Sequence, residues 1–324
     1  MILKILLSAV LVSMSFAADK SAKPFWVNRQ KAIQEDPDFS IQGEYFKEGS
    51  PYGVQVVALG GGKFDAYILE GGLPGLGWTK EKLRVKLTGE REGDMITFPE
   101  SQEFGLIITG QTAKLSGKSV TELPRMERKS PTLGAKAPEG AVVLFDGTST
   151  EHWTNGKMEN GLLLSTGATS KPTFKDYSLH LEFLTPYRPF ERGQGRGNSG
   201  VYFGGRWETQ VLDSFGLDGL NNECGGIYSI AAPSVNMCLP PLTWQTYDVD
   251  FTNAKFDAEG NRTAWPRMTV KLNGVVIHKD QELSKDFTTS APIDGPLKDE
   301  ARPVFLQNHS NPVFFRNIWV LPRK

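Results

Sequence analysis

The sequence has little cysteine, little histidine and almost no excess of charge of either sign. Its 324 residues include two cysteines and four histidines, and the formal net charge is −1. Nucleic acids and anionic membranes attract clustered Lys and Arg, and because the chain has no basic run we expect neither as a partner. No Gly-rich loop stands between a predicted strand and a predicted helix, which argues against a nucleotide site.

The sequence also lacks an N-terminal apolar run of membrane-spanning length, because the stretch from Ile5 to Val12 is too short to cross a bilayer. Lys4 precedes this stretch and Ser15-Phe16-Ala17-Ala18 follows it, which is the pattern of a cleaved signal peptide. A buried first helix is the alternative. We expect residues 1–18 to direct export to the periplasm or the cell exterior of a bacterium, with no membrane insertion of the mature chain.

The two cysteines, Cys224 and Cys238, leave two interpretations open. In an oxidising compartment they could form a disulfide, which would stabilise the fold by roughly 3 kcal/mol. They could equally be two buried free thiols. Two lone cysteines do not suggest a metal site.

Glycine, proline and aromatic residues are abundant, with 34 Gly, 20 Pro and 10% aromatics, which favours short strands between many turns. A short helix is expected within residues 24–36, ended by Pro37. We predict that residues 24–123 form a small antiparallel β domain of about six strands, in which Leu83, Val85 and Leu87 share one face. Residues 124–140 contain three prolines and no apolar period, so we interpret them as a linker.

Residues 141–324 are again rich in short apolar segments separated by turns, and we expect about ten strands there. The predicted fold class is therefore all-β, a two-sheet jelly-roll sandwich preceded by a smaller β domain. The predicted strands are AVVLFD, GLLLST, YSLHLEFLT, SGVYFGG, RWETQVLD, GGIYSI, QTYDVDFT, RMTVKLNGVVIH, RPVFLQNH and PVFFRNIWVL.

Two of these segments alternate between apolar and polar residues, so that polar side chains share one face of each strand. A polar face turned toward water would explain this pattern. However, the polar residues are rich in hydrogen-bonding groups rather than lysine, and they recur on several strands, which favours a ligand site. The polar sets are His180 and Glu182 in the first segment, and Arg206, Glu208 and Gln210 in the second.

The last two predicted strands could form a hairpin if Ser310-Asn311 is a two-residue turn. Gln307, His309 and Arg316 would then share one face. A polar edge hairpin is the alternative, and one extra turn residue would change the pairing. The Gly- and Arg-rich loop at residues 189–198 could border the same site or be a flexible surface loop.

The C-terminal part resembles the 3-keto-disaccharide hydrolase domain family, also described as 3-keto-glucoside lyase/hydratase. The resemblance covers residues 142–320, implies a concanavalin A-like jelly roll, and includes an extra N-terminal β domain like that of some exported members. The insertion at residues 189–197 is longer than the family pattern and could alter substrate access. The matching segments are VVLFDGTSTEHW, FKDYSLHLEF, GNSGVYF, WETQVLD, GGIY, VKLNGVVIH and FLQNHSNPVFFRNIWV.

The resemblance implies a carbohydrate substrate whose C3 ketone acidifies the proton on C2. A base removes that proton, the group at C1 departs, and water adds to the unsaturated sugar. In this hypothesis Glu208 is the base, His309 a second acid or base, and Arg316 the group that stabilises the enolate oxygen. The remaining candidates would bind substrate: Glu182, Asn198, Arg206, Gln210, Asp213, Tyr228 and Gln307.

Two other functions stay open on the sequence alone. An ordinary retaining glycosidase would need two carboxylates about 5–5.5 Å apart, but the position two after Glu208 is Gln210. A non-catalytic glycan-binding module could use the same fold. A divalent cation could sit among the carboxylates, although no ligand spacing demands one, and the sequence predicts no oligomeric state.

Overall fold

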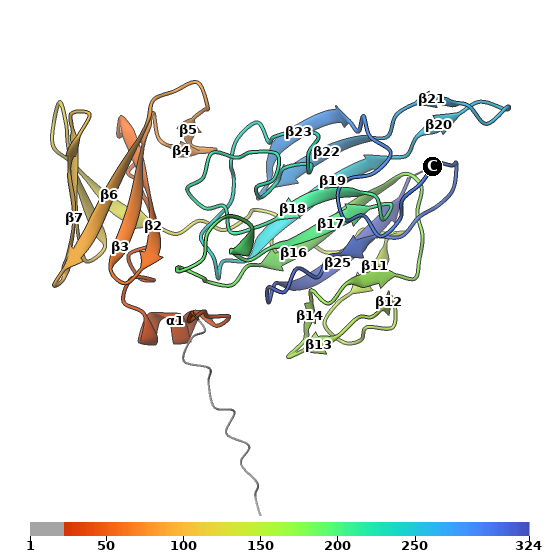
Figure 1. Cartoon of the computed structure of the whole chain (residues 1–324), viewed down its shortest axis with the longest axis horizontal. Coiled ribbons are helices and arrows are strands. Elements are labelled where there is room, and N and C mark those ends of the chain that lie inside the picture. The colour runs from red at the N-terminus through yellow and green to blue at the C-terminus, as the bar shows by residue number, and fades with distance from the viewer. Residues whose placement is uncertain (1–22, 324) are drawn as a thin grey trace, which may run out of the picture.

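The computed structural model describes residues 23–323, which form two β bodies joined by residues 127–141 (Figure 1). The expected signal peptide, residues 1–18, lies outside the described residues. The expected helix is present as α1 (Arg29–Glu35), where the Asn28 side chain accepts a hydrogen bond from the Lys31 backbone N–H and caps the first turn. Within residues 23–323, no helix has the length and apolarity needed to cross a membrane.

The first body is a closed antiparallel barrel of eight strands, two more than expected. Closure leaves no unpaired strand edge. Val85 and Leu87 are buried inside it, whereas Leu83, predicted to share their face, precedes the strand and is exposed. Going round the barrel, the strands are β1 (Gly43–Tyr45), β10 (Thr121–Met126), β9 (Thr112–Ser116), β8 (Phe104–Thr109), β7 (Met95–Ser101), β6 (Arg84–Glu92), β3 (Lys63–Glu70) and β2 (Tyr52–Gly60). A short parallel pair, β4 (Leu73–Pro74) and β5 (Gly77–Trp78), lies beside it.

The second body is the expected two-sheet sandwich, and its larger sheet has eight strands. In order they are β13 (Met158–Glu159), β14 (Leu162–Leu164), β25 (Phe314–Pro322), β16 (Tyr177–Leu184), β19 (Gln245–Thr252), β22 (Arg267–Leu272) and β23 (Val275–Glu282), with β11 (Val142–Phe145) paired to β25. A separate ribbon of β20 (Lys255–Phe256) and β21 (Arg262–Ala264) projects from one end (Figure 1).

The smaller sheet has five strands and carries the candidate site. In order they are β12 (Trp153–Thr154), β15 (Ala168–Ser170), β24 (Phe305–Leu306), β17 (Ser199–Phe203) and β18 (Trp207–Val211). Leu181 of β16 and Trp207 of β18 belong to the one core cluster that fills the space between the sheets. The inward faces predicted for these two strands are therefore correct.

Two local expectations need correction or completion. Residues 225–230 do not form a strand, because Gly225 has φ +83° and Ile227 makes only isolated bridges. Cys224 and Cys238 are both buried free thiols in the structure, so they are not bridged.

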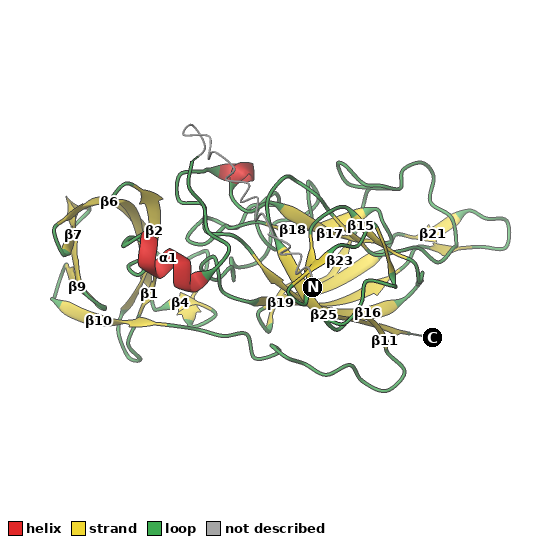
Figure 2. Ribbon diagram, turned by 90° about the horizontal axis from the view of Figure 1, so that it is seen from below, coloured by secondary structure: helices red, strands yellow, loops and turns green. Residues whose placement is uncertain are grey.

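The segment between the two bodies is an ordered strap rather than a loose tether. It comprises residues 127–141, because β10 runs three residues past the expected domain end, to Met126. The strap then follows the outer face of the larger sheet (Figure 2). There the Gly134 backbone N–H donates to Glu182 Oε1 at 2.6 Å, and Thr132 Oγ1 donates to Asp248 Oδ2 at 2.7 Å.

Candidate functional site

Glu208 lies on the outer face of β18, opposite the core, and is only 2% exposed. The facing strand places Tyr202 directly across from it, and the Tyr202 hydroxyl donates to Glu208 Oε2 at 2.9 Å. A Cβ on Gly200 would lie 2.1 Å from Glu208 Oε1. Glycine at this position therefore lets the carboxyl group fold back over β17.

The environment of Glu208 favours the protonated carboxyl group. Burial raises its pKa from 4.5 to about 8, although the hydrogen bond from Tyr202 acts in the opposite direction. Among residues 23–323, no arginine or lysine lines the pocket around this carboxyl group. A carboxylate with such a raised pKa is a strong base once it is deprotonated, so it suits removal of a proton from a carbon acid.

Three amide side chains form one wall of the same pocket. Gln210 Nε2 donates to Asn198 Oδ1 at 2.9 Å, and Asn198 Nδ2 donates to Gln194 Oε1 at 2.7 Å. Gln210 belongs to β18, whereas Gln194 lies in the short 3₁₀ turn Gly193–Gly195 of the Gly- and Arg-rich loop. That loop therefore does border the pocket, and amides held in a chain present fixed donors and acceptors to a polar ligand.

The opposite wall is formed by residues that come directly after β24 in the sequence. Gln307 Nε2 donates to the Tyr202 hydroxyl at 3.0 Å, whereas Gln307 Oε1 is buried and has no hydrogen-bond partner among the described residues. A buried acceptor that lines a pocket without a partner is a candidate for a ligand hydroxyl. His309 and Tyr228 complete the lining together with Thr289 and Ser290, around a volume of about 50 Å³. One edge of a sugar ring could enter this volume.

The structure thus brings together Glu208, His309, Asn198, Gln210, Tyr228 and Gln307 of the predicted site residues. Arg206 faces the same side but does not line the pocket. Its guanidinium donates to the carbonyls of Asp286, Asp294, Gly295 and Pro296 at 2.7 to 3.2 Å. Arg206 therefore anchors the loop that carries Thr289 and Ser290.

Asp213 also lies outside the pocket lining. It is 1% exposed, and its Oδ2 accepts a hydrogen bond from Arg196 Nε at 2.7 Å. Arg196 reaches the barrel as well, where its guanidinium donates to the Ala58 carbonyl and to Gln42 Oε1, both at 3.4 Å. The barrel therefore holds the loop that supplies Gln194 and Asn198 to the pocket.

The predicted hairpin is wrong, and with it the placement of Arg316. Strand β24 pairs with β15 and β17 in the smaller sheet, whereas β25 pairs with β16 in the larger one. The chain crosses between sheets at residues 307–313 instead of turning back on itself. Arg316 therefore lies away from Gln307 and His309, and its Nε donates to Glu182 Oε2 at 2.7 Å.

Glu182 is likewise not part of the pocket. It lies under the strap on the outer face of the larger sheet, 1% exposed, beside His180 and Asp248. His180 Nδ1 lies 2.6 Å from Asp248 Oδ1. Burial lowers the pKa of His180, but Asp248 and Glu182 outweigh that effect and the net shift is upward. The strap covers Glu182 and His180, so these two charges stabilise the contact between the strap and the sheet.

Sequence reasoning did not identify Gln194, Tyr202, Thr289 and Ser290, which line the pocket or hold Glu208. Alternation along SGVYF places Tyr202 on the same face as Gly200 and could have singled it out. Thr289 and Ser290 lie in a loop without any periodic pattern. Across residues 23–323, no group of three or more His, Cys, Asp or Glu is arranged to hold a metal ion.

Comparison with known proteins places the sandwich in a family. Residues 140–321 match the 3-keto-alpha-glucoside-1,2-lyase-like domain. A crystal structure of a candidate glycosyl hydrolase from Parabacteroides distasonis is 30% identical, with a TM-score of 0.51 over 58% of this chain and 85% of that chain. A second candidate glycosyl hydrolase from that organism is 19% identical, with a TM-score of 0.43 over 57% of this chain and 95% of that chain.

No curated protein matches the chain. The family match nevertheless spans more than half of the 324 residues and coincides with the two-sheet sandwich and its pocket. The ordered motifs of the sequence pointed to the same relationship. The chain belongs to the family of 3-keto-alpha-glucoside-1,2-lyase-like domains.

Proposed function

We propose that this protein cleaves glycosides whose sugar carries a ketone at C3. The observation that carries the proposal is the buried Glu208 carboxyl group, with its pKa raised to about 8, at the bottom of an amide-lined pocket. Membership in the family and the likeness to a candidate glycosyl hydrolase support glycoside cleavage. The raised pKa supports proton abstraction from carbon as the first step.

In the proposed reaction Glu208 takes the proton from C2, and the electrons of the C–H bond move into an enolate on the C3 oxygen. The hydroxyl of Tyr228 and the amides of the pocket stabilise that oxygen. The C1–O bond then breaks, and its electron pair leaves with the departing oxygen, which takes a proton from His309. Water can add to the resulting unsaturated 3-keto sugar.

The pocket does not favour an ordinary retaining glycosidase. That mechanism needs two carboxyl groups close together, and Glu208 is the only carboxylate among the described residues that line this pocket. A glycan-binding module without catalysis is the second candidate function. The chain of fixed amides from Gln194 to Gln210 favours it, because the same groups would hold sugar hydroxyls without any reaction.

The test is incubation of the protein with a panel of 3-keto-glucosides and the matching unoxidised glucosides, with and without a chelator. We expect release of the aglycone and an unsaturated or hydrated 3-keto sugar from the oxidised series alone. Cleavage of the unoxidised series would contradict the proposal, and binding without any product would favour the glycan-binding module. Loss of turnover in chelator would show that a divalent cation takes part.

We also propose that the protein is exported to the periplasm or the cell exterior. The lysine-flanked apolar run from Ile5 to Val12, followed by small residues, supports this. Fractionation of cells and sequencing of the mature N-terminus test it, since a signal peptide predicts a chain that begins after Ala18.

A further inference from the structure

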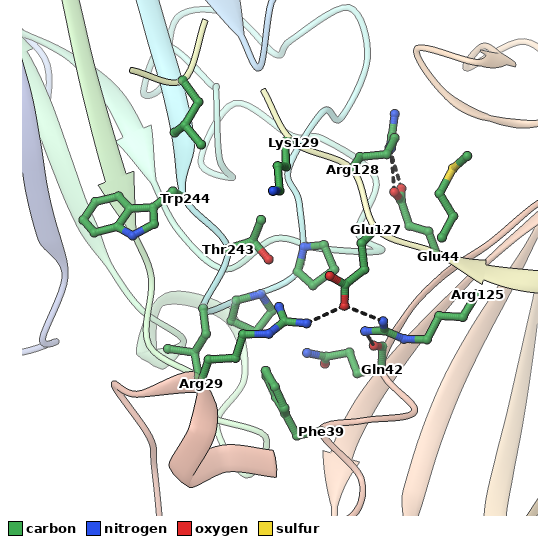
Figure 3. A pocket seen from close by; sticks show the side chains of 15 residues that line it. Arg29, Phe39, Gln42, Glu44, Arg125, Glu127, Arg128, Lys129, Thr243 and Trp244 are labelled. Carbon is green, nitrogen blue, oxygen red and sulfur yellow. Dashed lines mark hydrogen bonds and ion pairs between the residues drawn. The ribbon is translucent and has the colours of Figure 1, made fainter. Parts of the chain in front are cut away.

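A second hollow lies between the barrel and the sandwich and shares no lining residue with the pocket around Glu208. We call it the interdomain cleft, and its volume is about 250 Å³. Figure 3 shows side chains from both bodies converging on it. Its lining residues are Arg29, Phe39, Gln42, Glu44, Arg125, Met126, Glu127, Arg128, Lys129, Leu133, Pro240, Pro241, Leu242, Thr243 and Trp244.

The cleft has an excess of positive charge. Four of its lining residues are cationic and two are anionic, which leaves a net charge of about +2. Both carboxylates are already paired: Glu127 binds Arg29 and Arg125, and Glu44 binds Arg128 (Figure 3). The three arginines share these two carboxylates, and Lys129 has no carboxylate partner among the described residues, so the net charge of the cleft favours an anion.

Gln42 supplies a fixed donor without a partner. Its side chain is 1% exposed, and its Oε1 accepts hydrogen bonds from the Ala58 backbone N–H at 3.1 Å and from Arg196 Nη2 at 3.4 Å. These two donors fix the orientation of the amide. Its Nε2 has no hydrogen-bond partner among the described residues and points into the cleft (Figure 3). A buried donor left unsatisfied is unfavourable, and a ligand oxygen would satisfy it.

The remaining walls are apolar. Phe39, Pro240, Pro241 and Leu242 line the middle of the cleft, and Trp244 closes one end. The Arg316 guanidinium stacks on Trp244, 4.0 Å from the ring centroid, and fixes the indole. The volume equals the space of roughly eight water molecules, enough for one sugar ring. Apolar walls with a few placed polar groups are typical of small-molecule sites.

We infer that the interdomain cleft binds a monosaccharide that carries a carboxylate, a hexuronic acid, with the ring against the apolar walls. Its oxygens accept hydrogen bonds from Gln42 Nε2, and its charge lies near Lys129. This is a binding site separate from the proposed reaction, and it does not depend on that reaction. It gives the N-terminal barrel a role in recognising acidic sugars.

The test is isothermal titration calorimetry of the full chain with D-glucuronate and with D-glucose. Glucuronate should bind saturably, at least tenfold more tightly than glucose, and more weakly as salt is added. Gln42→Glu keeps the acceptor for Ala58 and Arg196 but replaces the free donor with an anionic oxygen, so it should weaken binding at least tenfold. Lys129→Gln should weaken it a few-fold, and Lys136→Gln, an exposed lysine of the strap outside the cleft, should leave it unchanged.

Thermal melting of each variant shows whether it is folded, and Lys129→Gln changes only an exposed side chain. Three results would overturn the inference: no saturable binding of glucuronate by the unaltered chain, equal affinity for glucose, or unchanged affinity in both Gln42→Glu and Lys129→Gln. None of these results bears on cleavage at the Glu208 pocket, so the two proposals succeed or fail separately.

Discussion

The two sheets of the sandwich carry similar outward polar faces, but one face is covered by another segment and the other lines a pocket. On the larger sheet, Glu182 and His180 point outward and are covered by the strap. On the smaller sheet, Glu208 and Gln210 point outward and line an open pocket. Alternation along a strand fixes which side chains leave the core, whereas the segment that packs above them decides between a sealed ion pair and a ligand site.

The pKa values of the two glutamates express the same difference. Burial alone would raise both. At Glu182, hydrogen bonds from His180, Asn317, the Gly134 N–H and Arg316 outweigh burial and lower the pKa to about 2. At Glu208 only Tyr202 opposes burial, and the pKa rises to about 8. A carboxylate with many partners stabilises the fold, and one with few partners is available for chemistry.

The largest effect expected from this comparison is on turnover. Glu208→Gln keeps the shape of the side chain but removes the base, so kcat on a 3-keto-glucoside should fall by roughly 10²–10⁴-fold. Glu182→Gln is the matched control on the other sheet and should keep kcat per folded molecule. Steady-state kinetics of both variants decide the matter, and a fully active Glu208→Gln would remove Glu208 from the reaction.

The second effect concerns stability. Glu182→Gln leaves Arg316 and the Gly134 backbone N–H with a weaker partner. Because Arg316 is partly exposed, the free energy of unfolding should fall by about 2 kcal/mol, less than for a fully buried pair. Chemical denaturation of the variant against the unaltered chain measures this. A loss below about 0.5 kcal/mol would mean that the strap is not held through Glu182.

These contrasts show how far sequence reasoning extends. The inward faces of YSLHLEFLT and RWETQVLD, and the outward position of Glu208 and Gln210, follow from a period of two along each strand. That period is a local property of the strand, so the alternation of side chains does not depend on which strands it pairs with. Two barrel strands escape this pattern. β1 has only three residues, and β10 has the sequence TELPRM, in which a proline and charged residues hide the alternation.

Strand pairing could not be predicted in the same way. Phe305 and Phe314 are close in sequence, yet their strands join opposite sheets. The residues around Ser310-Asn311 predict a tight turn from local sequence alone, whereas long-range packing determines which sheet each strand joins. The position of Gln194 at the pocket could not be predicted from the sequence either, because it depends on the barrel that holds its loop.

The third effect is on the pH dependence of stability. The folded pKa of Glu208 is raised to about 8 against 4.5 unfolded, so the folded chain binds an extra proton between these values. The contribution of Glu208 to the free energy of unfolding is fully present below about pH 4.5. It is lost as the pH rises through about 8, at up to about 1.4 kcal/mol per pH unit. Glu182, with its lowered pKa, contributes stability above about pH 4.5 that is lost as the pH falls through about 2.

Chemical denaturation across this pH range separates the two glutamates. The difference in unfolding free energy between Glu208→Gln and the unaltered chain should grow in favour of the variant as the pH rises toward 8. The free energy of unfolding that Glu182→Gln loses relative to the unaltered chain should become smaller as the pH falls from about 4.5 toward 2. A flat difference curve for Glu208→Gln would show that this carboxyl group titrates normally and is not buried as described.

The smallest effect tests whether the barrel serves the pocket. Arg196→Lys keeps a cation beside Asp213 but loses the forked contacts to the Ala58 carbonyl and Gln42 Oε1. The loop with Gln194 and Asn198 should loosen. In the proposed reaction these amides hold the substrate without moving a proton, so KM should rise about threefold to tenfold with kcat nearly unchanged. Amide hydrogen exchange at residues 189–198 should speed up in parallel. If exchange rises while KM stays constant, the amide wall does not bind the substrate; if neither changes, the barrel does not position the loop through Arg196.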